Sequence, residues 1–195
     1  PEDPPTAGAR QRAGEVGVAA VEPSTGAALR LLAAVAGART VVEVGTGAGV
    51  SSLWLLRGMR PDGVLTSIDS DGEYQRLARR SLTEAGVPSG RARLITGRAL
   101  EVLPRLSDRS YDMVFLDAAR SENDEYLDAA LRLLRPGGVV AFAGALAGGR
   151  VSDASSRDAE AVALRELSRR VREEARLVPA LLPVGGGLLV AALTG

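Results

Sequence analysis

Five short apolar segments alternate along this chain with longer segments that have helical spacing. The apolar segments are Thr40–Val44, Val64–Asp69, Ala92–Thr96, Asp112–Asp117 and Gly138–Phe142. Most of them are continuously apolar, which is typical of strands that are covered on both faces. Strands that alternate with helices indicate βαβ units with right-handed crossovers. The pattern therefore predicts an α/β fold with a mostly parallel sheet and helices on both faces.

The segments between the strands carry apolar residues at helical intervals. We expect helices over Thr25–Ala36, Ser51–Arg60, Asp71–Ala85, Glu122–Leu134 and Arg157–Arg176. Ser70 and Glu73 have the spacing of a capping box at the start of the third helix. Gly86 and the pair Gly137 and Gly138 stand where helices are expected to stop.

The length of 195 residues suits one ordinary domain, and no repeat or linker divides the chain. Residues 1–15 are rich in Pro, Gly and Arg and are expected to form an N-terminal tail or a partner-dependent arm, with one domain over residues 16–195. The first residue is Pro1, which is compatible with a missing upstream segment. Two apolar runs, Leu177–Pro183 and Leu188–Leu193, flank a glycine-rich turn and predict a closing hairpin.

The composition excludes several kinds of chemistry. The chain has no His, no Cys and no Lys, and all 24 basic residues are Arg. A Cys/His zinc site, a thiol nucleophile, a disulfide, a Ser-His-Asp triad, a P-loop lysine and a Schiff base are therefore absent. No apolar run has the length of a membrane span and no signal-peptide core stands at the start, so we expect no membrane partner. Function must depend on carboxylates, hydroxyls, Arg, backbone groups or a cofactor.

The charge balance argues against a nucleic-acid partner. Acidic and basic residues number 24 each, for a formal net charge of zero. The expected helix over residues 157–176 carries five arginines, at positions 165, 169, 170, 172 and 176, which leaves a nucleic-acid face as one interpretation. Glu166, Glu173 and Glu174 stand near these arginines, which favours a solvated and internally paired surface.

A glycine-rich turn is expected directly after the first strand. Gly45, Gly47 and Gly49 alternate between Thr40–Val44 and the following helix. Glycine allows a sharp turn and a close approach to a ligand, and the helix N-terminus favours an anionic group. Asp69, at the end of the second strand, is placed to accept hydrogen bonds from ribose hydroxyls, although it could instead cap the next helix. Together these features indicate a nucleotide-type cofactor.

The glycine spacing distinguishes between two cofactors. A nicotinamide enzyme more often has G-x-G-x-x-G, whereas this chain has G-x-G-x-G with Glu43 two positions before it. This favours S-adenosylmethionine, because its methionine end carries a carboxylate and an ammonium group. Glu43 would serve the ammonium group or hold the glycine loop; the alternative is a buried structural carboxylate bonded to backbone N–H groups.

Longer motifs resemble a known family. They are EVGTGAGVSSLWL, DGVLTSID, GRALEVL, YDMVFLDA, LLRPGG, GGRV and LLPVGGGLLVA. From about Val21 to the C-terminus the chain resembles the bacterial S-adenosylmethionine-dependent O-methyltransferases of the catechol and caffeoyl-CoA type, most closely a mycobacterial-type branch. The resemblance implies a class I methyltransferase fold, Rossmann-like, with a seven-stranded sheet whose last strand is antiparallel. It further implies a cytoplasmic homodimer that methylates a small molecule, and we expect the family's helical N-terminal segment to be missing.

The resemblance also implies a cofactor site for S-adenosylmethionine and its product S-adenosylhomocysteine. Val21 would lie over the methionine end, Asp69 with Ser70 would bind the ribose, Arg98 and Ala99 would border the adenine, and Asp117 would lie near the sulfonium. The methionine and ribose side would be lined by Glu43, Gly45, Thr46, Gly47 and Ser51.

The chain departs from the family where a divalent metal is usually bound. Asp117 stands at the first metal-ligand position, but the Asp-Asn pair is replaced by Ala143 and Gly144, and the general-base Lys by Arg120. One carboxylate does not hold a hard cation against water, and Arg is a poor base. We therefore expect no metal, with Asp117 as the remaining acid–base candidate. Asp117 could instead only contact the cofactor or cap its strand, and Arg120 or Arg150 could pair with an acidic acceptor.

The sequence leaves three functions to compare. A metal-free S-adenosylmethionine-dependent O-methyltransferase is favoured. A non-catalytic sensor or dimeric scaffold that binds the same cofactor is the alternative, and the glycine spacing disfavours a nicotinamide oxidoreductase. The acceptor is not identified by any motif, and residues 1–20 and 144–156 are expected to select it.

Overall fold

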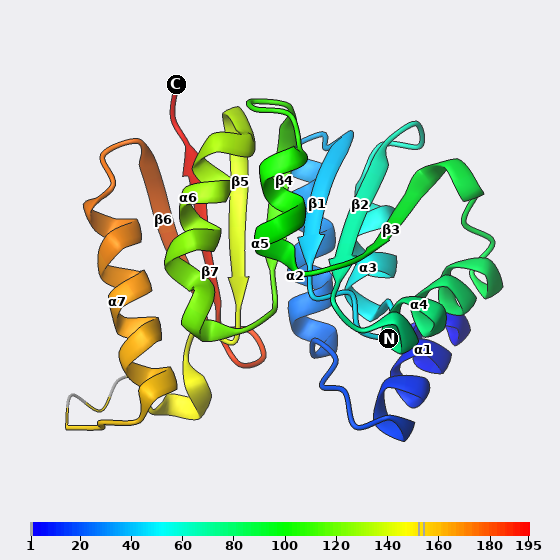
Figure 1. Ribbon diagram of the computed structural model, residues 1–195, viewed down its shortest axis with the longest axis horizontal. Helices are drawn as coiled ribbons and strands as arrows, with labels where there is room; N and C mark the ends of the chain where they lie inside the picture. The colour runs from blue at the N-terminus through cyan, green and yellow to red at the C-terminus, as the bar shows by residue number, and fades with distance from the viewer. Residues whose placement is uncertain (1, 152, 154) are drawn as a thin grey trace.

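The computed structural model describes residues 2–151, 153 and 155–195. A seven-stranded sheet runs through its centre in the order β3-β2-β1-β4-β5-β7-β6 (Figure 1). The strands are β1 Thr40–Val44, β2 Val64–Asp69, β3 Ala92–Thr96, β4 Tyr111–Leu116, β5 Leu134–Ala143, β6 Leu177–Leu182 and β7 Leu188–Leu193. β7 runs antiparallel to both of its neighbours, β5 and β6, whereas β1 to β5 pair in parallel. The expected α/β fold, with a mostly parallel sheet and a reversed last strand, is confirmed.

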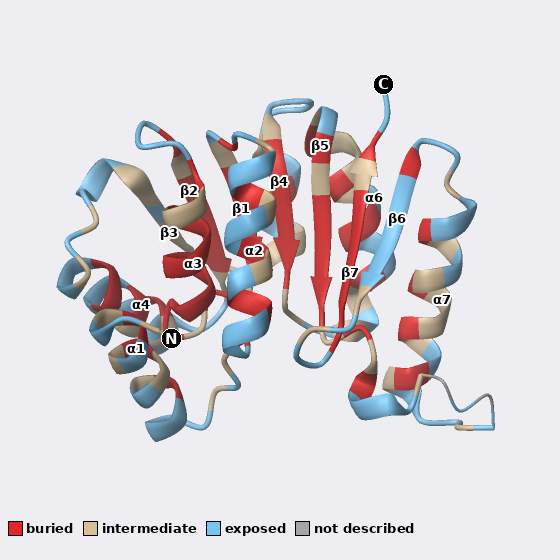
Figure 2. Cartoon of the chain, turned by 180° about the vertical axis from the view of Figure 1, so that it is seen from behind, coloured by how far each residue is buried: buried red, intermediate tan, exposed pale blue. Residues whose placement is uncertain are grey.

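Helices cover both faces of the sheet (Figures 1 and 2). They are α1 Pro4–Glu15, α2 Pro23–Val35, α3 Val50–Gly58, α4 Gly72–Glu84, α5 Ala99–Val102, α6 Asn123–Leu133 and α7 Ala159–Glu173. Short 3₁₀ turns are η1 Ser89–Arg91, η2 Leu103–Arg105, η3 Arg120–Glu122 and η4 Ala147–Gly149. Val42 and Val44 of β1 pack into the core beneath α6 and α7, whereas Val41 packs into the core beneath α2 and α3. This double burial explains why the strand sequences are continuously apolar.

The N-terminal segment is a helix over residues 4–15, where the sequence predicted a tail or arm. The Asp3 carboxylate caps α1 by accepting a 3.1 Å hydrogen bond from the backbone N–H of Thr6. Arg57 of α3 forms a 2.6 Å ion pair with Asp3, and Arg12 donates a 3.0 Å hydrogen bond to Ser81 of α4. Helix α1 is thus fixed to the helices that follow the first two strands.

Two local expectations are corrected and two are confirmed. Asp71, not Ser70, caps α4, because its carboxylate accepts hydrogen bonds from two N–H groups of the first turn. Gly137 and Gly138 lie within β5 rather than at a helix end. Gly86 follows α4 with a φ of 68°, as expected of a helix stop. The C-terminal hairpin is formed by β6 and β7.

Two of the four arginines within α7 form ion pairs with carboxylates. Arg169 pairs with Glu166 and Glu173, and Arg170 pairs with Asp124 and Asp128 of α6 at 2.9 and 2.8 Å. The interpretation of α7 as an internally paired surface is confirmed for Arg169, whereas Arg170 pairs with the neighbouring helix α6. The absence of a nucleic-acid partner stays a prediction. No helix in the described part of the chain combines the length and apolarity that a membrane crossing requires.

Candidate functional site

The turn between β1 and α3 is built by three glycines in left-handed backbone conformations. Gly45, Gly47 and Gly49 have φ angles of 91°, 50° and 88°. A Cβ atom at Gly45 would overlap the backbone carbonyl oxygen of Asp117, the residue directly after β4. The turn can therefore lie directly against the neighbouring strand end only because residue 45 has no side chain. This places the N-terminus of α3 at the carboxyl edge of the sheet, where open α/β sheets bind ligands.

Asp69 connects the glycine turn to the end of β2. Its Oδ2 accepts a 2.9 Å hydrogen bond from the backbone N–H of Gly47, and its Oδ1 accepts a 3.0 Å bond from that of Asp71. The alternative that Asp69 caps α4 is wrong, because Asp71 is the cap; Asp69 holds the backbone of Asp71 and lines both adjoining cavities. Each carboxylate oxygen accepts only one of these bonds, which leaves lone pairs for a ligand hydroxyl.

Glu43 is fully buried beneath the glycine turn. Its Oε2 accepts hydrogen bonds from the hydroxyls of Ser52 and Ser67, and its Oε1 has no hydrogen-bond partner among the described residues. Burial raises the pKa of Glu43 to about 7, although the serine hydroxyls act in the opposite direction. The partners are hydroxyls rather than the backbone N–H groups that the structural alternative anticipated. Glu43 lines neither cavity of the site and supports the turn from behind.

A chain of buried polar side chains extends from Glu43 under the turn. The Ser67 hydroxyl lies 2.7 Å from that of Thr46, and the Gln75 amide donates a 3.0 Å hydrogen bond to Thr46. Ser67 and Gln75 were not identified from the sequence. Their signal is a polar residue inside an otherwise buried strand and on the buried side of α4. Because every member is buried, the network fixes the position of Thr46.

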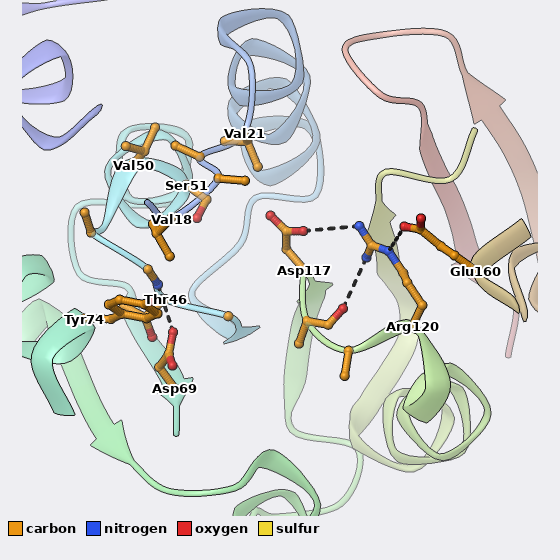
Figure 3. A pocket seen from close by; sticks show the side chains of 17 residues that line it. Val18, Val21, Thr46, Val50, Ser51, Asp69, Tyr74, Asp117, Arg120 and Glu160 are labelled. Carbon is orange, nitrogen blue, oxygen red and sulfur yellow. Dashed lines mark hydrogen bonds and ion pairs between the residues drawn. The ribbon is translucent and has the colours of Figure 1, made fainter. Parts of the chain in front are cut away.

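Two cavities adjoin the glycine turn, and the larger of these two, of about 500 Å³, opens above the turn (Figure 3). Seven predicted residues line it, namely Val21, Gly45, Thr46, Gly47, Ser51, Asp69 and Asp117. The segment before α2 contributes Val18, and α4 contributes Tyr74, neither of which the sequence pattern singled out. Residues from five separate parts of the chain thus converge where the sequence predicted a cofactor.

A smaller cavity, of about 210 Å³, adjoins the first. The two share the lining residues Gly45, Asp69, Ala118 and Ala119. Ser70, Arg98 and Ala99, the predicted ribose and adenine contacts, line the smaller one. Tyr126, which was not predicted, also lines it and donates a hydrogen bond to Glu122. The shape is that of one elongated site in two compartments, with Asp69 at their junction.

One corner of the larger cavity holds three charged side chains (Figure 3). The Arg120 guanidinium lies 3.6 Å from Asp117 and 3.7 Å from Glu160 of α7. Burial raises the pKa of Asp117, and the nearby Arg120 opposes this rise without cancelling it. Glu160 also forms a 2.6 Å ion pair with Arg150, which lies outside the cavity lining. Asp117 is therefore the carboxyl group best placed to exchange a proton with a ligand in this corner.

The residues near Asp117 do not fit a hard divalent cation. Ala143 and Gly144 offer no side-chain donor, and a Cβ atom at Gly144 would overlap the Arg120 guanidinium. The place beside Asp117 is thus taken by a fixed positive charge, whereas such a cation needs several oxygen ligands. Within residues 2–151, 153 and 155–195, no three His, Cys, Asp or Glu side chains are grouped to hold a metal ion. The expectation of a metal-free site stays a prediction.

A sequence profile described as "O-methyltransferase" matches residues 10–193. The chain belongs to this O-methyltransferase family. A Mycolicibacterium vanbaalenii protein, provisionally named an O-methyltransferase, is 55% identical over 191 residues, which cover 98% of this chain and 84% of that protein. The predicted family and its mycobacterial resemblance are confirmed.

Two solved structures resemble this O-methyltransferase over its whole length. The O-methyltransferase TomG of Streptomyces achromogenes, involved in tomaymycin synthesis and solved with S-adenosylmethionine, has a TM-score of 0.91 at 33% identity, with 100% of this chain and 92% of TomG covered. A Bacillus cereus O-methyltransferase in complex with S-adenosylhomocysteine has a TM-score of 0.90 at 28% identity, with 100% and 92% covered. The Rossmann-like class I methyltransferase fold is confirmed.

Proposed function

We propose that this O-methyltransferase transfers a methyl group from S-adenosylmethionine to an oxygen atom of a small-molecule acceptor, without a bound metal. The observation that carries the proposal is the two-compartment cavity with Asp69 at its junction, at the carboxyl ends of β1, β2 and β4. Support comes from the two structural neighbours, which were solved with S-adenosylmethionine and S-adenosylhomocysteine.

Successive residues along the cavity match successive parts of the cofactor, from the adenine through the ribose to the methionine end. Arg98, Ala99 and Tyr126 would hold the adenine in the smaller compartment. Asp69 would accept hydrogen bonds from the ribose hydroxyls, with Ser70 beside it. The larger compartment would hold the methionine end between Val21 and the turn formed by Gly45, Thr46 and Gly47, with Ser51 at the helix N-terminus. Glu43 would act through the turn that it supports.

The chemistry follows from what the cofactor supplies and what Asp117 offers. A bound sulfonium supplies an activated methyl group, so the protein's task is mainly to orient the acceptor and exclude water. Asp117 would accept the proton of the acceptor hydroxyl, because burial raises its pKa and it lines the same compartment as the turn. Arg120, which occupies the space next to Gly144, supports a mechanism without a divalent cation.

Calorimetric titration and a transfer assay test this function. We expect S-adenosylmethionine and S-adenosylhomocysteine to bind the protein and NAD⁺ not to bind. A panel of phenols, catechols and carboxylic acids is then incubated with labelled S-adenosylmethionine, with and without EDTA, and transfer is expected to be unchanged by EDTA. Binding of NAD⁺ alone would reject the proposal. Binding of S-adenosylhomocysteine with no transfer to any acceptor would favour the non-catalytic sensor.

Two finer expectations remain proposals about the whole protein. The family resemblance suggests a homodimer in the cytoplasm. Light scattering on the purified protein tests the first, with twice the chain mass of 20.2 kDa as the expected value. Fractionation of the native cells tests the second.

A further inference from the structure

The Arg120 guanidinium is a cation in the cavity that forms two long ion pairs, with Asp117 and Glu160, rather than a close one. Its side chain is 21% exposed, and its nearest carboxylate oxygens, on Asp117 and Glu160, lie 3.6 and 3.7 Å away. These separations exceed those of charge-assisted hydrogen bonds, which are about 2.7–2.9 Å. Among the described residues, its one hydrogen bond is a long one of 3.5 Å to the carbonyl oxygen of Ala118. Each guanidinium nitrogen faces one of these three partners over a long distance, so the second N–H groups of the two terminal nitrogens are left for a ligand.

Of the two neighbouring carboxylates, Glu160 has its close ion pair elsewhere and Asp117 is a candidate proton acceptor. Glu160 forms its close ion pair, at 2.6 Å, with Arg150 rather than with Arg120. Asp117 has its pKa raised by burial, and accepting a proton from an acceptor hydroxyl would remove its charge altogether. During such a step the charge of Arg120 would face the cavity with less compensation than in the resting site.

The backbone around Arg120 is shaped to place this charge in the corner. Gly144, at the end of β5, has a φ of 67°, and any Cβ atom there would overlap the guanidinium. Arg120 is the first residue of η3, and Glu160 of α7 faces its guanidinium on the other side. The guanidinium is thus confined between β4, β5 and α7 while it lines the cavity (Figure 3).

We propose that Arg120 binds an anionic oxygen of the methyl acceptor, a carboxylate or a phenolate, and that it thereby restricts the acceptors to small molecules that carry such a group. This inference rests on the proposed function, because it takes the corner beside Asp117 to be the acceptor subsite. Guanidinium groups bind carboxylates through two parallel hydrogen bonds, which also orient the ligand.

Matched ligands separate the effect of charge from that of shape. Protein saturated with S-adenosylhomocysteine is titrated with two pairs of ligands. The first pair is 3,4-dihydroxybenzoate and its neutral amide. The second pair is 4-nitrocatechol and catechol, at a pH at which 4-nitrocatechol is ionised and catechol is neutral. We expect the wild type to bind the anion of at least one pair ten or more times more tightly than the neutral partner. Equal affinity within both pairs, or no binding of any anion, would overturn the proposal.

Substitutions assign the preference to Arg120. In Arg120→Gln the anion is expected to lose ten-fold or more in affinity while the neutral partner changes by less than three-fold, and Arg120→Lys is expected to keep an intermediate preference. Arg172→Gln is the control, because it removes an arginine of α7 that lines neither compartment, and its preference should equal that of the wild type. Arg150→Gln should instead lower the anion preference partway, because it releases Glu160 to pair with Arg120. An undiminished preference in Arg120→Gln would contradict the assignment.

Gly144→Ala provides a second test that leaves the charge in place. Its added methyl group should displace the guanidinium and weaken anion binding as Arg120→Gln does, with thermal unfolding measured to confirm that the variant is folded. Affinity for S-adenosylhomocysteine should stay within three-fold in the Arg120 variants. Failure of the wild type to bind S-adenosylhomocysteine would reject the proposed function, whereas intact binding with no anion preference would reject only the role of Arg120.

Discussion

The backbone N–H of Gly47 donates a 2.9 Å hydrogen bond to the carboxylate of Asp69. This bond ties the turn after β1 to the end of β2, so the two parts of the predicted cofactor site hold each other in position. Because Asp69 lines both compartments of the cavity, one side chain both shapes the turn and faces a ligand. The two roles can be separated experimentally, because an amide oxygen can replace the carboxylate as an acceptor for Gly47 but not as a charge.

Asp69→Asn is expected to weaken binding of S-adenosylhomocysteine by ten-fold or more. The amide oxygen can keep the bond from Gly47 but is a weaker acceptor for ribose hydroxyls than a carboxylate. The amide NH2 group cannot accept the exposed bond from the backbone N–H of Asp71, so the free energy of unfolding should fall by about 1 kcal/mol. Calorimetric titration and urea unfolding measure the two effects. Asp71→Asn is the control, because Asp71 lies two residues away and caps α4 but does not line either compartment. Equal losses of affinity in both variants would argue against a ribose contact at Asp69.

Gly45→Ala is expected to destabilise the fold strongly. The new Cβ would overlap the carbonyl oxygen of Asp117, and the φ of 91° is strained for alanine, so the loss should be about 3 kcal/mol or more. Gly37→Ala is a matched control, since Gly37 has a φ of 57° with open space around it and should cost only about 1–2 kcal/mol. Urea unfolding compares them, and a similar loss in both would mean that the close approach to Asp117 has no energetic consequence.

Glu43 should make stability depend on pH. Its pKa in the folded protein is about 7, above the ordinary 4.5, so the folded state binds the proton more tightly than the unfolded state. The stabilisation is fully present below about pH 4.5, falls as the pH rises and is lost by about pH 7, a change of about 3 kcal/mol. Urea unfolding between pH 5 and pH 8 should show this fall in the wild type relative to Glu43→Gln. Parallel pH profiles for the two proteins would contradict the raised pKa.

Asp117→Asn distinguishes a proton acceptor from a mere cofactor contact. As the proton acceptor, Asp117 should contribute about 10²–10⁴-fold to the transfer rate, so kcat falls by that factor while affinity for S-adenosylhomocysteine changes little. Single-turnover assays with a saturating acceptor found in the panel measure the rate. A large loss of affinity with an unchanged rate would assign Asp117 to cofactor binding alone.

The elements of the fold were predictable because each strand is short, apolar and bounded by a turn. The start of the chain was not, since its Pro, Gly and Arg residues are typical of irregular segments. Asp3 and the prolines after it do form a helix start, with Asp3 as the cap and proline in the first turn. The helix is then held by tertiary contacts such as the Arg57–Asp3 ion pair, which no local pattern contains.

The candidate site was predictable where one motif supplies the residues. The turn from Gly45 to Gly49 and the strand-end Asp69 follow from local spacing. Ser67, Tyr126 and Glu160 were missed because they reach the site from separate elements, and only the folded sheet brings them together. Arg120 was noticed as a departure from the family, but its confinement beside Gly144 follows only from the three-dimensional structure.

A crystal structure with S-adenosylhomocysteine tests the central claim most directly. The account predicts the ribose hydroxyls on the Asp69 carboxylate, the adenine between Arg98 and Tyr126, and the homocysteine end against the glycine turn. A ligand bound elsewhere, or in this site with its ribose away from Asp69, would contradict the account.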